Sequence, residues 1–286
     1  MVGMPDSPYS DLSRPPLRQP ALQRALVTPG GLWTEIRVVA ETGSTNADLA
    51  EAARAGAAEG LVLVAESQTA GRGRQGRGWS APPRAGITVS VLLRPDVPSR
   101  RLGWLPLLAG VALVEAVGRV AVVDAGLKWP NDTLARSATE EGPYGKCAGV
   151  LAEAVPPAVV LGVGLNVSQR VDELPPPPVA GSVPPTSLAL IDAASTDRDP
   201  LLRAVLRRLA DWYGRWVSAG GDADACGLRD AYRECCLTIG AEVAVTLPGG
   251  DILRGQASDV DADGRLVVAT AEGSRTVSAG DVIHVR

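Results

Sequence analysis

The sequence is poor in the residue types that most hydrolases and metalloenzymes depend on. It contains one histidine, His284, which is third from the end of the 286-residue chain. This argues against Ser-His-Asp catalysis, a Cys-His pair and metal sites built from several histidines. The four cysteines have no C-x-x-C spacing, which argues against a zinc site or a disulfide framework. Cysteines used in this way indicate reduced thiols, and we expect a cytoplasmic protein.

Long apolar runs and an excess of positive charge are also missing. The best apolar run, residues 105–118, is short and carries Glu115, and prolines interrupt the N-terminal region. We therefore predict neither a signal peptide nor a membrane span. The formal net charge of −4 argues against a protein that binds nucleic acid through its overall field.

Lysine and asparagine are scarce, and the positions where they remain are informative. Of 28 cationic side chains, only Lys128 and Lys146 are lysines, and the chain has three asparagines, Asn46, Asn131 and Asn166. Chance placement in turns is one explanation. The other is that a coding bias removed these residues wherever nothing required them. On that hypothesis, the segments G-S-T-N, K-W-P-N-D, G-K-C-A-G and G-L-N-V meet at one site.

The chain divides into three parts by composition. Residues 1–33 are rich in proline and predict a mostly flexible leader with at most one short helix, near residues 21–27. Residues 34–236 predict a catalytic domain of strands and helices. From residue 237, short alternating strands separated by P-G-G-D and D-A-D-G turns predict a small β-barrel that ends at residue 286.

Within residues 34–236, hydrophobic patterning sets the expected elements. It predicts strands at residues 34–41, 61–67, 86–95, 126–132, 146–155 and 158–168, and helices at 43–60, 102–120, 200–218 and 223–236. A turn at Pro156 and Pro157 predicts that two of these strands form a hairpin, and the proline-rich residues 173–187 predict an exposed loop.

Residues 70–79, A-G-R-G-R-Q-G-R-G-W, form a loop rich in glycine and arginine, which we call the Gly-Arg loop. Its G-x-G-x-x-G match does not indicate a dinucleotide fold, because the following S-A-P-P-R-A-G cannot open the required helix. A disordered RGG-type segment is also disfavoured, since the loop is single and lies between two strong strands. Arginines and free backbone N–H groups favour an ordered clamp for a phosphate or carboxylate.

Together these motifs resemble those of the biotin protein ligases. The matching segments are G-S-T-N (43–46), residues 66–79, residues 86–95, K-W-P-N-D (128–132), residues 145–153 and residues 159–167. The resemblance extends from about residue 35 to residue 283. It implies an α/β (α+β) mixed-sheet catalytic domain of the biotin/lipoate ligase type, followed by a small SH3-like barrel.

The resemblance also implies an activity. Family members join biotin to ATP with release of pyrophosphate, giving biotinoyl-5′-AMP, and then transfer biotin to one lysine of a biotin carboxyl carrier domain. Biotin and ATP would be the substrates, with Mg²⁺ as the metal ion. Two alternatives stay open: a lipoate–protein ligase, and a non-catalytic scaffold that senses biotin or binds nucleic acid.

The first half-reaction brings a carboxylate against a phosphate. Two unit charges about 4 Å apart repel by roughly 4 kcal/mol at an effective dielectric near 20, so fixed cations must offset the repulsion. No protein nucleophile is needed, which agrees with the lack of usable histidine. By resemblance, the residues expected to act in catalysis are Lys146, Arg74 and Lys128.

By resemblance, the substrate-binding residues fall into two overlapping sets. The biotin set is Ser44, Thr45, Asn46, Gln68, Arg72, Gly73, Arg74, Lys146 and Gly149. The ATP set is Arg72, Arg74, Arg77, Trp79, Lys128, Asn131, Lys146 and Asn166. Asp132 is the candidate Mg²⁺ ligand, although it equally fits a turn cap. Ser44 and Thr45 likewise fit helix capping, and Trp129 fits either the core or the site.

Some relatives in this family carry an N-terminal helix-turn-helix domain and act as repressors. About 33 residues precede the predicted catalytic domain here, too few for that module. We therefore predict no DNA-binding role and no membrane partner. The sequence leaves the oligomeric state open between a weak homodimer and a monomer.

Overall fold

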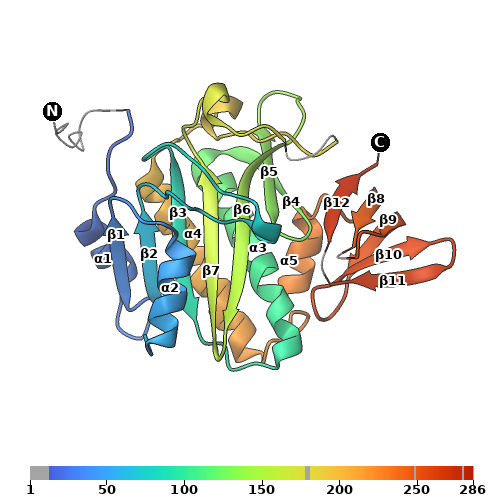
Figure 1. Cartoon of the computed structure of the whole chain (residues 1–286), viewed down its shortest axis with the longest axis horizontal. Helices are drawn as coiled ribbons and strands as arrows, with labels where there is room; N and C mark the ends of the chain where they lie inside the picture. Colours follow the sequence, from blue (N-terminus) through green and yellow to red (C-terminus); the bar gives the residue numbers. More distant parts are fainter. Residues whose placement is uncertain (1–12, 178–180, 248, 279, 286) are drawn as a thin grey trace.

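A computed structural model describes residues 13–177, 181–247, 249–278 and 280–285. Its centre is a seven-stranded mixed sheet in the order β1-β2-β3-β7-β6-β5-β4 (Figure 1). The strands are β1 (Glu35–Val39), β2 (Leu61–Ala65), β3 (Gly86–Leu93), β4 (Val123–Lys128), β5 (Asp132–Ser137), β6 (Gly145–Val155) and β7 (Ala158–Asn166). Only β1 and β2 pair in parallel, and every other neighbour is antiparallel.

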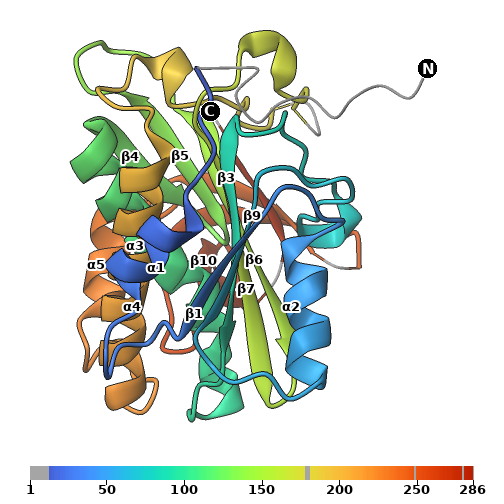
Figure 2. The same cartoon turned by 90° about the vertical axis from the view of Figure 1, so that its left-hand side faces the viewer.

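Helices cover the two faces of this sheet unequally. The single helix α2 (Thr45–Arg54) covers one face, and the other face carries α1 (Gln19–Leu26), α3 (Trp104–Ala121), α4 (Arg198–Ser218) and α5 (Leu228–Cys235) (Figure 2). Short 3₁₀ turns are η1 (Arg74–Gly76), η2 (Ser99–Gly103), η3 (Val171–Glu173) and η4 (Ala189–Ile191). Because only one helix covers it, the α2 face leaves room for a cavity.

Helix α3 is the apolar centre of the molecule. The segment Ser99–Ala121 is long and apolar enough to cross a membrane by length and composition, but 67% of its most apolar window is buried inside the fold. It packs against α4, α5 and the strands β4, β5, β6 and β7. A helix that is hydrophobic all round is expected in such a core position.

Most of the predicted elements are confirmed, with differences at their ends and one additional strand. Helix α5 begins at Leu228 rather than at residue 223, and β4 covers Val123–Lys128 rather than residues 126–132. Helix α2 begins after Ser44, whose side chain accepts a hydrogen bond from the Ala47 N–H, but it ends at Arg54 rather than at residue 60. Strand β5 was not predicted: after the Pro130–Asn131 turn, the chain runs back antiparallel to β4. The hairpin of β6 and β7 turns at Pro156 and Pro157, as the sequence predicted.

The prediction of a flexible leader through residue 33 is wrong for the residues that the structure describes. Leu17, Leu22, Leu26 and Trp33 are buried in the main apolar core. The α1 side chains also bind the edge of the sheet: Gln23 accepts a hydrogen bond from the Ile36 N–H, and Gln19 accepts one from the Val38 N–H. Burial of these apolar side chains holds the segment in the fold despite its prolines. Residues 1–12 lie outside the described part of the chain.

The C-terminal part is a five-stranded antiparallel sheet in the order β11-β10-β9-β8-β12. Its strands are β8 (Glu242–Thr246), β9 (Ile252–Val260), β10 (Leu266–Thr270), β11 (Gly273–Val277) and β12 (Asp281–His284). The buried residues Val243, Val245 and Leu266 join the same apolar core as the seven-stranded sheet. No pairing of β11 with β12 occurs among the described residues, so the SH3-like barrel stays a prediction.

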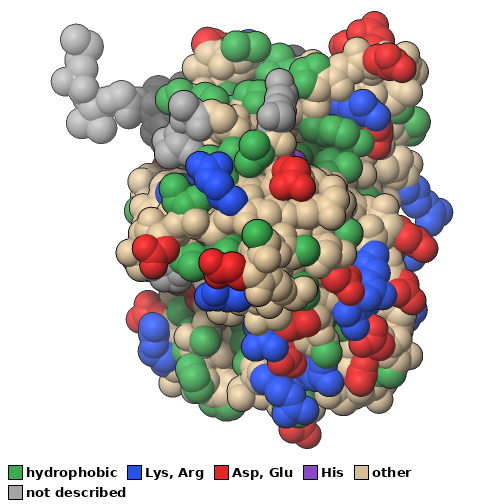
Figure 3. Space-filling view, turned by 90° about the vertical axis from the view of Figure 1, so that its right-hand side faces the viewer, with side chains coloured by type: hydrophobic (Ala, Val, Ile, Leu, Met, Phe, Trp, Pro, Cys, Tyr) green, Lys and Arg blue, Asp and Glu red, His purple; other side chains and the backbone are tan. Residues whose placement is uncertain are grey.

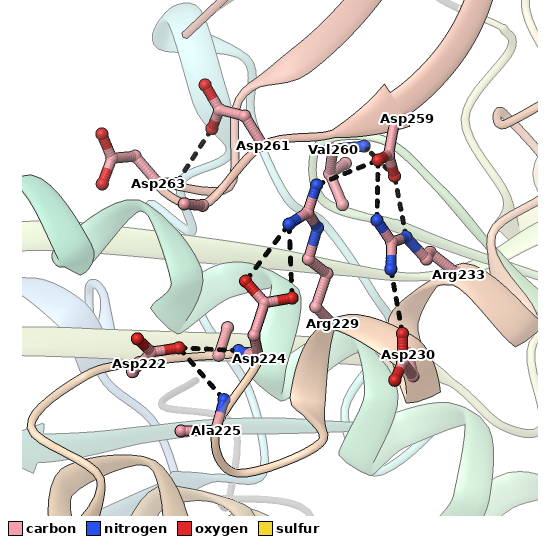
Figure 4. Close-up of polar contacts among 12 residues, drawn as sticks. Asp222, Asp224, Ala225, Arg229, Asp230, Arg233, Asp259, Val260, Asp261 and Asp263 are labelled. Atoms are coloured by element: carbon pink, nitrogen blue, oxygen red, sulfur yellow. Dashed lines mark hydrogen bonds and ion pairs between the residues drawn. The ribbon is translucent and has the colours of Figure 1, made fainter.

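An ion-pair network fastens this C-terminal sheet to α5 (Figure 4). Asp259 on β9 accepts hydrogen bonds from Arg229 at 2.9 Å and from Arg233 at 2.7 Å. Arg229 also reaches Asp224, and Arg233 reaches Asp230. The two arginines hold the pKa of Asp259 near 2, with the Arg233 hydrogen bond as the largest cause. On the neighbouring surface, positive and negative side chains interleave rather than separate (Figure 3).

Candidate active site

A cavity of about 590 Å³ lies on the α2 face of the sheet and extends to the C-terminal sheet. Every residue that the sequence analysis assigned to biotin, ATP or metal lines this cavity: Ser44, Thr45, Asn46, Gln68, Arg72, Gly73, Arg74, Arg77, Trp79, Lys128, Asn131, Asp132, Lys146, Gly149 and Asn166. The hypothesis that the scarce lysines and asparagines gather in one place is therefore confirmed.

Glycines form the floor of the cavity. Gly162 and Gly164 on β7 face Ser90 and Thr88 on β3, and Gly149 on β6 pairs with Gly164. A Cβ atom on Gly162 would lie 2.1 Å from Asn46 Oδ1, and one on Gly164 would lie 2.3 Å from the Trp79 ring. The glycines therefore let Asn46 and the Trp79 ring rest directly on the backbone of the sheet.

At one end of the cavity, neutral polar side chains bind one another. The Thr45 N–H donates to Gln68 Oε1 over 2.8 Å, and the Ser90 hydroxyl lies 2.7 Å from Thr45 Oγ1 and 2.6 Å from Asn46 Oδ1. The Asn46 amide donates to Glu153 over 2.6 Å. Ser44, Thr45 and Asn46 are each at most 5% exposed. We call this end of the cavity, with Gln68 and Ser90, the neutral end.

The opposite end holds cations. Lys128 ends β4, Lys146 stands near the start of β6, and Arg74 reaches in from the Gly-Arg loop. Lys146 Nζ lies 2.6 Å from Asp132 Oδ1, and Arg74 donates to Asn131 Oδ1 over 3.2 Å. The Lys128 ammonium makes no hydrogen bond or ion pair with any residue that the structure describes, although its backbone pairs with Asp132 of β5. We call this group the cationic end.

Burial at the cationic end lowers the pKa values of Lys128 and Arg74. Burial is the largest cause of the lowered pKa of Lys128; Lys146 and Arg77 lower it further, while Asp132 opposes the shift. Burial also lowers the pKa of Arg74. Burial makes the charged forms of these side chains less favourable. An anion that enters the site stabilises them, so part of its binding free energy comes from offsetting the loss of solvation.

The C-terminal sheet contributes to the cationic end. Arg77 of the Gly-Arg loop forms an ion pair with Asp281 on β12. Trp129, which is buried, donates its backbone N–H to Thr238 Oγ1 over 3.0 Å and its indole N–H to the Gly264 carbonyl over 3.2 Å. Both the Gly-Arg loop and the K-W-P-N-D turn are therefore held from the C-terminal side.

His284 lies behind the same turn, as part of the support and outside the lining of the cavity. Its Nε2 lies 3.1 Å from Thr238 Oγ1. Burial, with a smaller effect from Lys128, lowers the pKa of His284 to about 4. The imidazole is therefore neutral at pH 7.

Asn166 lines the cavity, but its amide is already used within the fold. It donates to the Thr186 carbonyl over 2.9 Å and accepts from Gln169 over 3.0 Å. These bonds fix the segment that returns beside Lys146, where the Lys146 N–H donates to the Pro184 carbonyl. The predicted contact of Asn166 with adenine, like that of Trp79, stays a prediction.

Sequence reasoning left several polar residues of the site unassigned, among them Ser90, Glu153 and Asp281. Ser90 is a fully buried hydroxyl in an otherwise apolar stretch of strand, and that anomaly was its local signal. Glu153 and Asp281 come from a strand end and from the last strand of the chain. Glu153 lies in the segment 145–153 that matches the family, but it was given no role, whereas Asp281 joins the site only through tertiary packing.

No group of three or more His, Cys, Asp or Glu side chains able to hold a metal is present among the described residues. The carboxylates lining the cavity are Asp132 and Asp281, and each already pairs with a cation. Such a site fits Mg²⁺ that arrives with a polyphosphate, since Mg²⁺ commonly uses one or two carboxylates plus substrate phosphates.

Comparison with family models gives two matches. Residues 39–168 match the Biotin/lipoate A/B protein ligase family, and residues 238–285 match the Biotin protein ligase C terminal domain. The first match contains most of the cavity residues. The second begins one residue after the predicted start of the C-terminal part.

Comparison with individual proteins covers nearly the whole chain. A biotin--[acetyl-CoA-carboxylase] ligase of Mycobacterium tuberculosis is 45% identical over 96% of this chain and 98% of its own length. A bifunctional ligase/repressor of Bacillus spizizenii is 30% identical over 84% of this chain and 70% of its length. Among solved structures, a biotin protein ligase from Aquifex aeolicus in complex with biotin and ATP has a TM-score of 0.71, with 26% identity over 89% of this chain and all of that one.

Proposed function

The chain belongs to the biotin protein ligase family, and from this premise we propose that it activates biotin with ATP and transfers it to a carboxylase carrier protein. The observation that carries the proposal is the division of one cavity into the neutral end and the cationic end. Biotin has the same division: a polar, uncharged ureido ring at one end and a carboxylate at the other.

The neutral end suits the ureido ring. Gln68, Thr45, Asn46 and Ser90 already hold donors and acceptors in fixed positions, so a ligand with matching groups exchanges hydrogen bonds without leaving buried groups unpaired. The biotin carboxylate then points along the glycine floor toward Lys146.

In the first step, a biotin carboxylate oxygen attacks the α-phosphorus of ATP. A new P–O bond forms, and the bond from that phosphorus to the pyrophosphate oxygen breaks. Lys146 and Arg74 offset the repulsion between carboxylate and phosphate, and Lys128 offsets the charge that develops on the leaving group. Asp132 holds the Lys146 ammonium in place until the substrates arrive.

Mg²⁺ would neutralise polyphosphate charge at the cationic end, with Asp132 as the protein carboxylate that can reach it. Arg72, Gly73 and Arg77 line the same part of the cavity from the Gly-Arg loop. We propose that they close over the adenylate once it has formed, and that Trp79 covers it from the glycine floor.

In the second step, the amine of a carrier-domain lysine attacks the carbonyl carbon of the adenylate. An amide forms as the amine nitrogen loses a proton to solvent, and AMP leaves with the electrons of the C–O bond. The biotin carboxyl carrier domain of an acyl-CoA carboxylase is therefore the proposed partner.

Other features of the proposal follow from the sequence and composition. We propose that the reaction takes place in the cytoplasm, that the chain binds neither operator DNA nor a membrane, and that it acts as a monomer or a weak homodimer. All four cysteines are free thiols, which supports a reducing compartment.

One assay tests the function against its two rivals. The protein is incubated with ATP, Mg²⁺, a carrier domain and either biotin or lipoate, and the carrier is analysed by mass spectrometry. We expect the mass increase of a biotinoyl group. Transfer of lipoate alone would identify a lipoate–protein ligase, and transfer of neither would favour a non-catalytic scaffold.

A further inference from the structure

The segment just after residue 12 is bound into the fold by charged side chains. Arg14 is 9% exposed, and its guanidinium donates to both carboxylate oxygens of Glu173, over 3.1 and 2.6 Å. The same group donates to the Ser168 carbonyl over 2.8 Å. Arginine is suited to this arrangement because its planar fork binds a carboxylate with two parallel hydrogen bonds.

A second ion pair fixes the backbone on either side of Pro16. Arg198 donates to Glu66 over 2.5 Å and to the Pro15 carbonyl over 2.6 Å. Glu66 in turn accepts the Leu17 N–H over 2.6 Å. Arg198 is 5% exposed and Glu66 is 9% exposed, so the pair is a buried anchor. The residues that follow Arg14 are therefore fixed to the fold by buried hydrogen bonds.

The groups that Arg14 holds lead directly to the wall of the cavity. Ser168 follows Asn166 by two residues at the end of β7, and Glu173 closes the η3 turn immediately before Leu174. The next residues, Pro175 and Pro176, line the cavity. Arg14 itself does not touch the cavity, so its effect on any ligand must pass through these residues.

This wall lies at the end of the cavity opposite the neutral end. Along β7, Asn46 rests on Gly162, the Trp79 ring rests on Gly164, and Asn166 follows two residues later. The returning side of the same loop pairs with Lys146 at Pro184 and Thr186. The wall therefore faces the adenylate part of the ligand.

Without Arg14, the Glu173 carboxylate would keep one partner, Arg170, whose side chain is 67% exposed. Glu173 is only 12% exposed, so it would lose its buried partner and gain little solvent in exchange. Arg14 is the largest cause of the lowered pKa of Glu173. The Glu173 carboxylate would regain solvent most easily if η3 moved outward, and Pro175 and Pro176 would move with it.

We propose that Arg14 is a positioning residue that sets the affinity for ATP by holding the Pro175–Pro176 wall of the cavity through Glu173 and Ser168. The inference rests on the proposed function, because it takes the wall to face the nucleotide. The segment around Arg14 therefore belongs to the working enzyme.

The test compares Arg14→Ala, Arg14→Lys and a control from the same segment, Gln23→Ala, which removes the bond to the β1 backbone and leaves the loop contacts intact. ATP and biotin binding are measured separately by calorimetry. We expect Arg14→Ala to weaken ATP binding about tenfold and biotin binding less than twofold. Arg14→Lys should recover part of the loss, and Gln23→Ala should change neither affinity.

Hydrogen exchange supplies a readout independent of ligand. In Arg14→Ala, amides of residues 168–174 should exchange faster while those of α2 stay unchanged. If Arg14→Ala fails to fold, Glu173→Gln replaces it and is expected to weaken ATP binding in the same direction. Equal weakening of ATP and biotin binding, or unchanged ATP binding, would overturn the inference while the proposed function stands. A wild-type protein that binds no ATP would overturn both.

Discussion

The two ends of the cavity hold their polar groups in opposite ways. At the neutral end, Thr45, Asn46 and Ser90 are buried, Gln68 is half-buried, and the four side chains are joined by hydrogen bonds. At the cationic end, positive side chains are crowded and only partly paired, and burial lowers the pKa of Lys128. The polar groups of the neutral end are already held in fixed positions. The cationic end instead holds buried positive charge that a bound anion would stabilise.

The difference suggests how the ends divide the work. We propose that the preformed neutral end selects biotin by shape and hydrogen bonding with little rearrangement. At the cationic end, positive charge is unfavourable without an anion. We therefore propose that these side chains stabilise the transition state, where negative charge is greatest, more than they stabilise the ligand-free protein. Substitutions at the two ends should therefore separate effects on biotin affinity from effects on the rate of adenylation.

The largest effect is expected at Lys146. Lys146→Arg keeps the charge, but a guanidinium would fork onto Asp132, only 2.6 Å from the present ammonium, and would not bridge carboxylate and phosphate. We expect biotin-dependent exchange of pyrophosphate into ATP to fall by about 10²–10³-fold. Arg275→Lys on the exposed strand β11 is the control and should have no effect. Near-normal exchange would remove Lys146 from its proposed role.

The neutral end should respond differently. In Gly162→Ala, the new Cβ would lie 2.1 Å from Asn46 Oδ1 and would displace that amide from Ser90 and Glu153. Loss of a buried hydrogen bond costs roughly 1–3 kcal/mol, so KM for biotin should rise about 10- to 100-fold while KM for ATP changes little. Gly214→Ala, where the Cβ meets open space on α4, is the matched control. A rise in KM for ATP alone would contradict the assignment of biotin binding to the neutral end.

The cationic end should also respond to pH. Because burial lowers the pKa of Lys128 below its usual 10.5, this ammonium loses its proton at a lower pH than an exposed lysine would. The charged form binds phosphate, so ATP affinity should fall by about tenfold as the pH rises through that lowered value. Lys128→Arg should move this fall to higher pH. An alkaline limb unchanged in Lys128→Arg would show that another group titrates.

The smallest effect is expected at the contact between the Gly-Arg loop and the C-terminal sheet. Asp281→Asn removes the charge that pairs with Arg77, and both side chains are more than one-third exposed. Exposed ion pairs contribute about 0–1 kcal/mol, so KM for ATP should rise fivefold at most, with the difference shrinking in high salt. A loss of several hundredfold would indicate that Asp281 acts in the chemistry.

Sequence reasoning succeeded where local pattern carries the information. The G-S-T-N and K-W-P-N-D segments marked both ends of the cavity, and Ser44 marked the start of α2. It failed for Asp281, which reaches the site only through the packing of distant strands, and it assigned no role to Ser90 although residues 86–95 were recognised as a matching segment. It failed also for residues 13–33, because the prolines there suggested an open chain while Leu17, Leu22 and Trp33 fit into the core.

The most direct test of the division is a crystal structure of the protein with a non-hydrolysable analogue of biotinoyl-5′-AMP. The account predicts the ureido ring against Thr45, Asn46 and Gln68, and the phosphate among Lys128, Lys146 and Arg74. A ligand bound in the reverse direction, or with its phosphate away from both lysines, would contradict it.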